Sequence, residues 1–315
     1  MAIIKVSELA YCRLRVPDLD KGEQFLVDFG LIPTVREEGR RFFRATDPHP
    51  YCYVIEEGPQ RFLGFAFHSK SREDLDSLAE QQGAPVEVID APGGGVRVRL
   101  TEPNGYDVDV VHGIEPAEPI AVQRQVLNSG AQPLLRKGEL FRLKRGEPTP
   151  VKRLAHVVLG SPQVRATVDW FHDTLGTISS DEVVAGPEKK LIGSFIRVDN
   201  GEDYVDHHAV FVIANPTSGL QHISFEVPDV DAVFHDHHHL RKLGRYEHMW
   251  GIGRHLLGSQ IFDYWADPFG YSHEHWADSD RLNASAPTTT WDAREGMVTQ
   301  WGDEPPEKFR NCVRP

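Results

Sequence analysis

The sequence predicts an α+β protein of two similar domains, each built from two βαβββ modules. Three observations lead to this prediction. A strand, turn and amphipathic helix pattern occurs four times along the 315 residues. Short strand-like segments follow each copy. The second half of the chain then repeats the plan of the first half, which is typical of a duplicated structural unit.

The first and third modules share one plan. Residues 9–31 are LAYCRLRVPDLDKGEQFLVDFGL, and residues 154–176 are LAHVVLGSPQVRATVDWFHDTLG. Each begins as an apolar strand, passes through a turn that contains proline, and continues as a helix whose apolar residues, such as Phe25 or Trp170, recur at helical spacing. A glycine near the end of each helix suits the left-handed conformation of a C-cap.

The second and fourth modules repeat this plan. Residues 63–78 (LGFAFHSKSREDLDSL) and 220–237 (LQHISFEVPDVDAVFHDH) again predict a strand, a turn and a helix. Segments rich in β-branched and aromatic residues follow every helix and complete the βαβββ pattern. We expect the four modules at residues 8–60, 61–113, 153–215 and 219–277.

These modules pair into two domains of ordinary size, and each pair can close a curved sheet around a cavity. Between them, the segment RLKRGEPTPV has the charge and proline content of a linker. We expect an N-terminal domain without a metal site at residues 1–141, a linker at 142–152, a C-terminal catalytic domain at 153–280, and a tail at 281–315 that packs on the C-terminal domain.

Composition limits the classes of partner. The formal net charge is −13, and no basic stripe is present to neutralise phosphates, which argues against a nucleic acid or an anionic membrane surface. A small molecule is therefore the expected partner. No apolar run could span a bilayer, and the N-terminus lacks the features of a secretory signal, so we expect a cytoplasmic protein. Three cysteines are too few for a disulfide framework.

The two halves differ at three inward-facing positions. Alignment of matching turns pairs Tyr11 with His156, Phe65 with His222, and Asp109 with Glu274. Because two of the three N-terminal residues bind metals poorly, only the C-terminal half is expected to keep a metal site. Two imidazoles and one carboxylate leave coordination positions open, which suits non-haem Fe(II), with Mn(II) as the alternative. A structural zinc would prefer four closed ligands.

Glu274 lies between two histidines in the segment DPFGYSHEHW (267–276). Strand alternation sends Glu274 to one face and both His273 and His275 to the other. A carboxylate inside a core needs a cation or a dense set of donors to offset its desolvation. A bound dication is therefore its expected partner.

The segment GRHLLGSQIFDYWADPFGYSHE (253–274) resembles the signature of the extradiol ring-cleaving dioxygenases of the vicinal oxygen chelate superfamily. The resemblance is to the two-domain form that includes catechol 2,3-dioxygenases and dihydroxybiphenyl dioxygenases, and it covers nearly the whole chain. One departure is Asp263, which precedes the signature tyrosine where an apolar residue is usual. We expect this change to alter the local shape of the substrate pocket.

The resemblance implies roles for individual residues. As metal ligands it implies the three aligned residues His156, His222 and Glu274. It further implies that His208, the second histidine of VDHHAVFV, acts on dioxygen, and that His255 and Tyr264 contact the substrate or the oxygen. The implied reaction is extradiol (meta) cleavage of a catechol-type diol by dioxygen to a muconic semialdehyde-type product, with catechol or a substituted catechol as substrate and a homo-oligomer as the assembly.

Two alternatives use the same module pair. A glyoxalase-like isomerase would hold a metal with two carboxylates, whereas only one glutamate fits here. A ligand-sequestering protein of the bleomycin-resistance kind would have no need for two histidines and a glutamate at matching positions. Titration with Fe(II) separates the sequestering protein from the enzyme.

A more conspicuous histidine cluster follows the fourth strand-turn pattern. In HDHHH (235–239), His235, His238 and His239 have the i, i+3, i+4 spacing of one helix face, which could chelate a metal. We interpret this cluster as a solvent-exposed helix face, because nothing nearby supplies the second layer of hydrogen bonds that metal ligands usually have.

Overall fold

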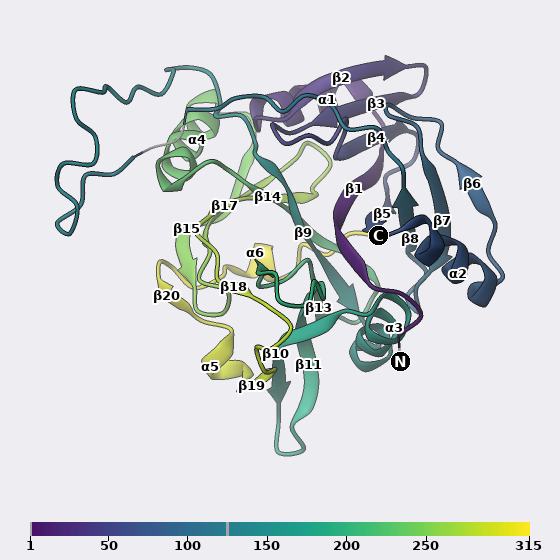
Figure 1. The fold of residues 1–315 in the computed structure, drawn as a ribbon. Helices are drawn as coiled ribbons and strands as arrows, with labels where there is room; N and C mark the ends of the chain where they lie inside the picture. Colours follow the sequence, from purple (N-terminus) through teal and green to yellow (C-terminus); the bar gives the residue numbers. More distant parts are fainter. Residues whose placement is uncertain (1, 124–125) are drawn as a thin grey trace.

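The computed structural model describes residues 2–123 and 126–315, and two large mixed sheets dominate it (Figure 1). Each sheet collects two βαβββ modules, so the predicted α+β class and module plan are confirmed. None of the described helices is both long enough and apolar enough to cross a membrane.

The N-terminal sheet has eight strands in the order β2-β3-β4-β1-β5-β8-β7-β6. Its first module consists of β1 (Val6–Val16), α1 (Leu19–Asp28), β2 (Ile32–Glu37), β3 (Arg40–Arg44) and β4 (Tyr53–Glu57). Its second module consists of β5 (Arg61–Ser69), α2 (Arg72–Gln82), β6 (Val86–Val88), β7 (Val96–Thr101) and β8 (Asp107–His112). The leading strands of the two modules, β1 and β5, pair antiparallel at the centre of the sheet.

The C-terminal sheet has ten strands in the order β19-β10-β11-β13-β9-β14-β17-β16-β15-β20. Its first module consists of β9 (Arg153–Ser161), α3 (Val164–Leu175), β10 (Ile178–Ala185), β11 (Lys190–Arg197) and β13 (Val210–Ala214), with the short β12 (Val205–Asp206) before β13. Its second module consists of β14 (Gly219–Glu226), α4 (Val230–Leu243), β15 (Glu247–His255), β16 (Ile261–Ala266) and β17 (Ser272–Ala277). Here β9 and β14 form the central antiparallel pair.

Equivalent helices in the two halves are capped alike. The N-cap side chains of Ser71 and Asp229 each accept a hydrogen bond from the backbone N–H three residues later, at Asp74 and Ala232. Such caps satisfy one of the N–H groups that a helix start leaves unpaired. The matching caps make Ser71 and Asp229 equivalent starting points for α2 and α4.

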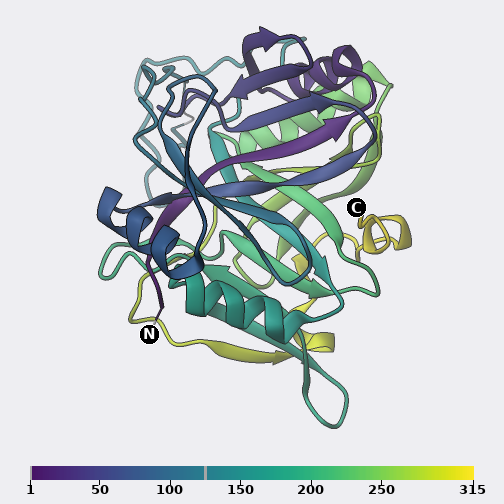
Figure 2. The ribbon, with the colours of Figure 1, turned by 90° about the vertical axis from the view of Figure 1, so that its right-hand side faces the viewer.

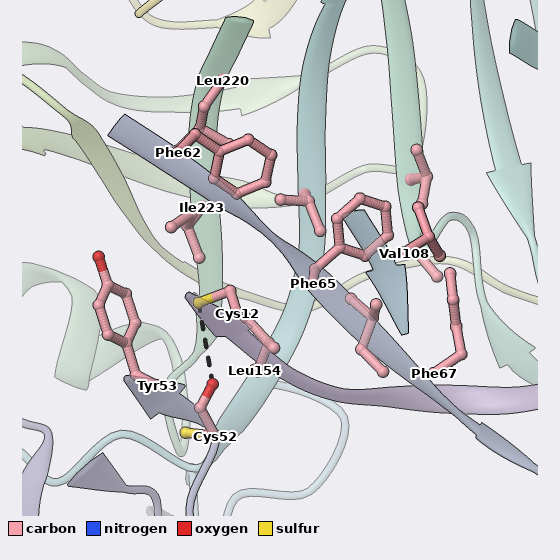
Figure 3. Packing of buried hydrophobic residues seen from close by; sticks show 14 of the residues in the cluster. Cys12, Cys52, Tyr53, Phe62, Phe65, Phe67, Val108, Leu154, Leu220 and Ile223 are labelled. Atoms are coloured by element: carbon pink, nitrogen blue, oxygen red, sulfur yellow. Dashed lines mark hydrogen bonds between the residues drawn. The ribbon is translucent and has the colours of Figure 1, made fainter. Parts of the chain in front are cut away.

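The two halves share one hydrophobic core. Figure 3 shows Phe62 and Phe65 from β5 packed in the same layer as Leu220 and Ile223 from β14, and all four belong to one cluster of buried residues. Complete burial of an aliphatic or aromatic side chain of this size contributes about 1.5–3 kcal/mol. The layer therefore holds the two central strand pairs, one of which carries His156 and His222, against each other.

Irregular chain joins the sheets and follows the second one. The described residues between β8 and β9, 113–123 and 126–152, form neither strand nor helix, and this connection extends past α4 in Figure 1. The tail carries β18 (Arg281–Leu282), β19 (Thr289–Asp292), α5 (Ala293–Gly296), β20 (Thr299–Trp301) and α6 (Glu307–Arg310). β19 and β20 add to opposite edges of the C-terminal sheet. The chain end lies close to the N-terminal half (Figure 2), where the carbonyl of Pro315 accepts the N–H of Phe62.

Candidate metal centre

Three predicted ligands meet inside the C-terminal sheet. His156 lies on β9, His222 on β14 and Glu274 on β17, and their candidate ligand atoms lie within 4.8 Å of one another. Glu274 Oε2 is 3.0 Å from His156 Nε2 and 3.5 Å from His222 Nε2, while the two imidazole nitrogens are 3.3 Å apart. Because β9, β14 and β17 are neighbouring strands, the sheet itself brings the three side chains together.

The centre is buried and its imidazoles lie near a carboxylate. Burial lowers the pKa of His222 to about 4, so this imidazole is neutral near pH 7 and keeps a lone pair for a metal. Burial alone would raise the pKa of Glu274, but the neighbouring His156, His222 and His255 hold it well below its usual value. Glu274 is therefore an anion inside the core.

Two atoms of the centre lack hydrogen-bond partners among the described residues. Both Glu274 Oε1 and His156 Nδ1 are buried without one. Native proteins rarely leave buried polar atoms unpaired, and each exception calls for an explanation such as an ion. Two imidazoles, a carboxylate and an unpaired carboxylate oxygen fit a divalent transition metal.

Two neighbours orient the candidate ligands and were not identified from the sequence. Ser224 donates its hydroxyl to Glu274 Oε2 at 2.5 Å. His222 Nδ1 donates to the side-chain oxygen of Gln221, which leaves Nε2 for the metal. Alternation already places Ser224 on the face of His222, which was an available signal. Gln221 could not be found this way, because a register irregularity between Leu220 and His222 allows adjacent side chains to meet.

His208 lies beside the candidate ligands. Its ring centroid is 4.1 Å from that of His156 and 5.0 Å from that of Phe195. Burial, together with the neighbouring His156 and His207, holds the pKa of His208 well below its usual value. His208 Nδ1 is 3.1 Å from His207 Nδ1, and His207 Nε2 is in turn 2.7 Å from Asp181 Oδ2.

His255 and Tyr264 come together on the other side of the centre. The ring nitrogen Nε2 of His255 lies 2.9 Å from the Tyr264 hydroxyl and 3.7 Å from Glu274 Oε1. Burial and the nearby Glu274 raise the pKa of Tyr264 well above its usual value, so its phenol keeps its proton. The side chain of His255 is 22% exposed, so the centre is closest to solvent here.

Known proteins resemble this chain over nearly all of its length. Residues 153–274 match the model of the Glyoxalase/Bleomycin resistance protein/Dioxygenase superfamily. The chain is 30% identical over 312 residues to metapyrocatechase 2 of Cupriavidus necator, covering 96% of this chain and 91% of that protein. The chain belongs to the extradiol ring-cleaving dioxygenases.

Solved structures show the same fold as this dioxygenase. Homoprotocatechuate 2,3-dioxygenase from Brevibacterium fuscum superimposes with a TM-score of 0.79 at 20% identity, covering 99% of this chain and 94% of that one. An Mn(II)-bound glyoxalase from Novosphingobium aromaticivorans also gives 0.79, at 23% identity, with coverages of 96% and 94%. At these identities the likeness concerns the fold alone.

The strand register of this dioxygenase corrects one pairing between the halves. Asp109 pairs with Ala66 as Glu274 pairs with Ser224, so these two carboxylates are equivalent. By the same register the position of His222 is occupied by Gly64, and the expected equivalence of His222 with Phe65 is wrong. Matching Leu63 with Leu220 caused the error. In the structure Phe62 is the residue equivalent to Leu220, because Phe62 pairs with Leu14 as Leu220 pairs with Leu159, and Leu63 lies in the bulge.

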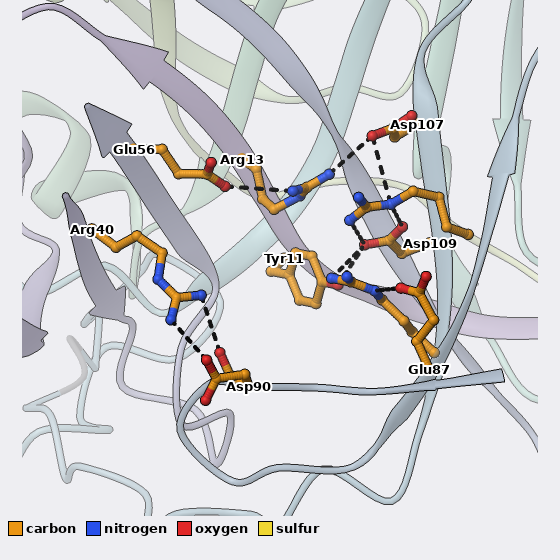
Figure 4. Close-up of polar contacts among 10 residues, drawn as sticks. Tyr11, Arg13, Arg40, Glu56, Glu87, Asp90, Asp107 and Asp109 are labelled. Atoms are coloured by element: carbon orange, nitrogen blue, oxygen red, sulfur yellow. Dashed lines mark hydrogen bonds and ion pairs between the residues drawn. The ribbon is translucent and has the colours of Figure 1, made fainter. Parts of the chain in front are cut away.

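In the N-terminal half of this dioxygenase an arginine neutralises the equivalent carboxylate. Asp109 is buried, and both its oxygens accept hydrogen bonds from Arg99, at 2.7 and 3.0 Å, while Tyr11 donates at 2.7 Å (Figure 4). Burial opposes the charge, but Arg99, Arg13 and Tyr11 keep the pKa of Asp109 below its usual value. Arg99 lies across from Asp109 in the strand register, as Tyr264 lies across from Glu274. In the N-terminal half the guanidinium of Arg99 therefore supplies the positive charge beside the carboxylate.

The histidines that flank Glu274 face the other half of the molecule, as alternation predicts. His273 Nε2 lies 2.9 Å from the Tyr53 hydroxyl, and His275 Nε2 donates to the Phe29 carbonyl at 2.7 Å. Burial lowers the pKa of His273 to about 3, so it is neutral. His273 and His275 thus connect the C-terminal half to the N-terminal half.

The histidine-rich helix is less exposed than expected. His238 is exposed, but His235 lies 3.0 Å from the Lys144 carbonyl and His239 is half-buried. The interpretation of this run as a solvated face is therefore wrong for both. The reason is that the connection between the sheets passes along α4, where Thr149 donates its N–H to Asp236.

The side chain of Asp263 points away from the centre, toward His237 and His248. Its expected effect on the shape of the substrate pocket is therefore not seen.

Proposed function

We propose that this dioxygenase cleaves catechol or a substituted catechol beside the diol, with Fe(II) held by His156, His222 and Glu274. The observation that supports the metal most directly is Glu274 itself. Among the described residues, its ion-pair partners are histidines alone, whereas the equivalent Asp109 has arginine. A buried carboxylate without a fixed cation needs another source of positive charge.

The substrate class rests on the sequence relatives. Metapyrocatechase 2 of Cupriavidus necator aligns along nearly the whole chain. A manganese-dependent 2,3-dihydroxybiphenyl 1,2-dioxygenase of Geobacillus genomosp. 3 is 23% identical over 290 residues, covering 84% of this chain and 82% of that protein. Since Fe(II) and Mn(II) accept the same imidazole and carboxylate ligands, Mn(II) is the alternative ion.

The surrounding residues divide the remaining tasks. When bound, the metal supplies a chelation point that lowers the pKa of the diol hydroxyls and brings diol and dioxygen together. His208 is neutral, and its Nδ1 is turned toward His207. Its Nε2 is therefore the nitrogen that exchanges a proton on the dioxygen side of the substrate ring. Tyr264 keeps its phenol proton and, with His255, donates hydrogen bonds to the diol oxygens.

Anaerobic reconstitution tests this function. The metal-free protein is loaded with Fe(II) or Mn(II), catechol is added, and oxygen uptake and the yellow absorbance of a ring-opened semialdehyde are recorded after air is admitted. We expect one oxygen consumed per catechol and yellow product. His156→Ala and His222→Ala should lose activity and the metal held at this centre, while the matched exposed-histidine variant His238→Ala keeps both.

Three results would contradict parts of the proposal. Full activity in His156→Ala would remove the proposed ligand set. Tight metal binding without oxygen uptake would reject catechol as the substrate. Binding of catechol without any metal would favour a ligand-sequestering protein over an enzyme.

The homo-oligomer stays a prediction, which light scattering tests.

A further inference from the structure

A second group of metal-binding side chains lies where α4 covers the C-terminal sheet. His237 comes from α4, His248 from β15 and Asp263 from β16. Asp263 Oδ1 is 3.0 Å from His237 Nδ1 and 2.8 Å from His248 Nε2, and the three candidate ligand atoms lie within 4.8 Å of one another. Three elements that are separate in sequence thus direct nitrogen and oxygen donors at one point.

Asp263 is a buried carboxyl group whose ion-pair partners are imidazoles. Its side chain is 0% exposed, and its ion-pair partners among the described residues are His237 and His248. A buried carboxylate that faces two imidazole nitrogens is an arrangement of donors that a divalent ion completes.

The N-terminal half has an apolar contact at the same place. With Asp109 matched to Glu274, the register places Val98 at the position of Asp263. Val98 is fully buried in the hydrophobic core. A valine there is what a strand residue beneath a helix is expected to be, so the carboxylate in the C-terminal half is a departure that packing does not require.

The helix side of this contact differs in the same way. Counting from the capping residues Ser71 and Asp229, His237 on α4 corresponds to Ala79 on α2, which packs against the core. Ala79 and Val98 of one half thus correspond to His237 and Asp263 of the other. Two matched changes from apolar to metal-binding residues across one helix–sheet contact indicate a ligand between them.

We propose that His237, His248 and Asp263 bind a divalent first-row transition ion such as Zn(II), separate from the centre at Glu274. Two nitrogen donors favour such an ion over Ca²⁺ or Mg²⁺, which take oxygen ligands. The His248 side chain is 31% exposed, so water can complete the coordination from that side. Trp265 donates its indole N–H to Asp263 Oδ2 at 2.5 Å and orients the carboxylate.

The two centres lie on opposite faces of β16 and can be measured separately. Tyr264, the neighbour of Asp263, turns its ring toward His222, with centroids 5.0 Å apart. By alternation Asp263 turns toward α4 instead. The second ion ties α4 to β15 and β16, so it contributes stability by mass action and plays no part in ring cleavage.

Metal stoichiometry tests this proposal. The chain is stripped of metal and titrated with Zn(II) in a calorimeter at a fixed, near-neutral pH, because metal binding depends on pH. We expect two equivalents for the wild-type chain and for the control His238→Gln, which changes the exposed neighbour of His237. His248→Gln should bind one equivalent, with affinity for the other lowered by about 100-fold or more.

Further readouts separate this site from the catalytic centre. Fe(II)-loaded His248→Gln should retain oxygen uptake with catechol, while Zn(II) should no longer raise its thermal midpoint as far as that of wild type. His237→Gln repeats the test if His248→Gln fails to fold. Two equivalents in both variants, or one equivalent in wild type that His156→Ala alone abolishes, would overturn the proposal. One equivalent in wild type that only His248→Gln loses would support this site and reject the first.

Discussion

The proposed role of His208 in proton exchange depends on the burial of its imidazole. It lies against Phe195 and His156, and its lowered pKa keeps it neutral at the pH where the enzyme is expected to work. We expect His208→Ala to retain the metal and to lose about 10²–10⁴-fold in turnover, the usual contribution of a positioned acid or base. Metal analysis and oxygen uptake check this, and unchanged turnover would remove the role.

Gly64 explains why the N-terminal half cannot carry the second histidine. Its φ is +125°, and a Cβ atom there would lie 2.0 Å from the Asp107 carbonyl oxygen. We expect Gly64→Ala to lower the free energy of unfolding by about 2–3 kcal/mol, measured by urea denaturation. The control Gly39→Ala also has positive φ but an open Cβ position, and should cost about 1 kcal/mol. Equal losses in both variants would contradict the steric argument.

Individual residues also mark the limit of what the sequence predicts. Alternation and the repeat predict that His156, His222 and Glu274 point inward, and the structure brings them together on neighbouring strands. The sequence could not reveal the bulge at Leu63, because two leucines aligned better than Phe62 with Leu220. Helix spacing predicts contacts only between residues of the same helix. It could not predict the partners of His237, because His248 lies on β15 and Asp263 on β16.

At the scale of elements, the turn between β16 and β17 contains a buried acid. Asp267 accepts backbone N–H groups from Phe269 at 2.8 Å and Tyr271 at 2.9 Å, yet burial raises its pKa to about 7. The unfolded chain releases this proton near pH 4. Between about pH 4 and 7 the folded state therefore binds more protons than the unfolded state, and this group lowers stability as pH rises.

Asp267→Asn removes this pH-dependent loss of stability, because the amide does not ionise. Its oxygen can still accept the N–H groups of Phe269 and Tyr271. We expect the variant to gain stability over the wild type progressively from pH 4 to 7, up to roughly 4 kcal/mol by the value of one pKa unit. Urea unfolding at several pH values measures the difference. The exposed Asp203→Asn is the control. A stability difference that does not change with pH would contradict the raised pKa.

At the scale of the whole molecule, the tail connects the candidate centre to both halves. The backbone of Arg314 pairs with Leu220 on β14, and the carbonyl of Pro315 also accepts the Tyr271 hydroxyl at 3.1 Å. Between these contacts and the sheet edge, α6 places the ring of Phe309 4.4 Å from that of Tyr264 and 6.1 Å from that of His222. The tail thus covers the centre with an aromatic side chain.

Phe309→Ala should open this cover without touching a candidate ligand. Removing a buried aromatic ring leaves a cavity that water can enter, since polar groups of Tyr264 and His222 line one side. We expect faster metal loss during dialysis and a KM for catechol raised about 10-fold, with turnover less affected because the proposed proton donors remain. Phe234→Ala, which removes an exposed ring from α4, is the matched control. If Phe309→Ala and Phe234→Ala retain metal equally well and share one KM, the tail stabilises the fold and does not shield the centre.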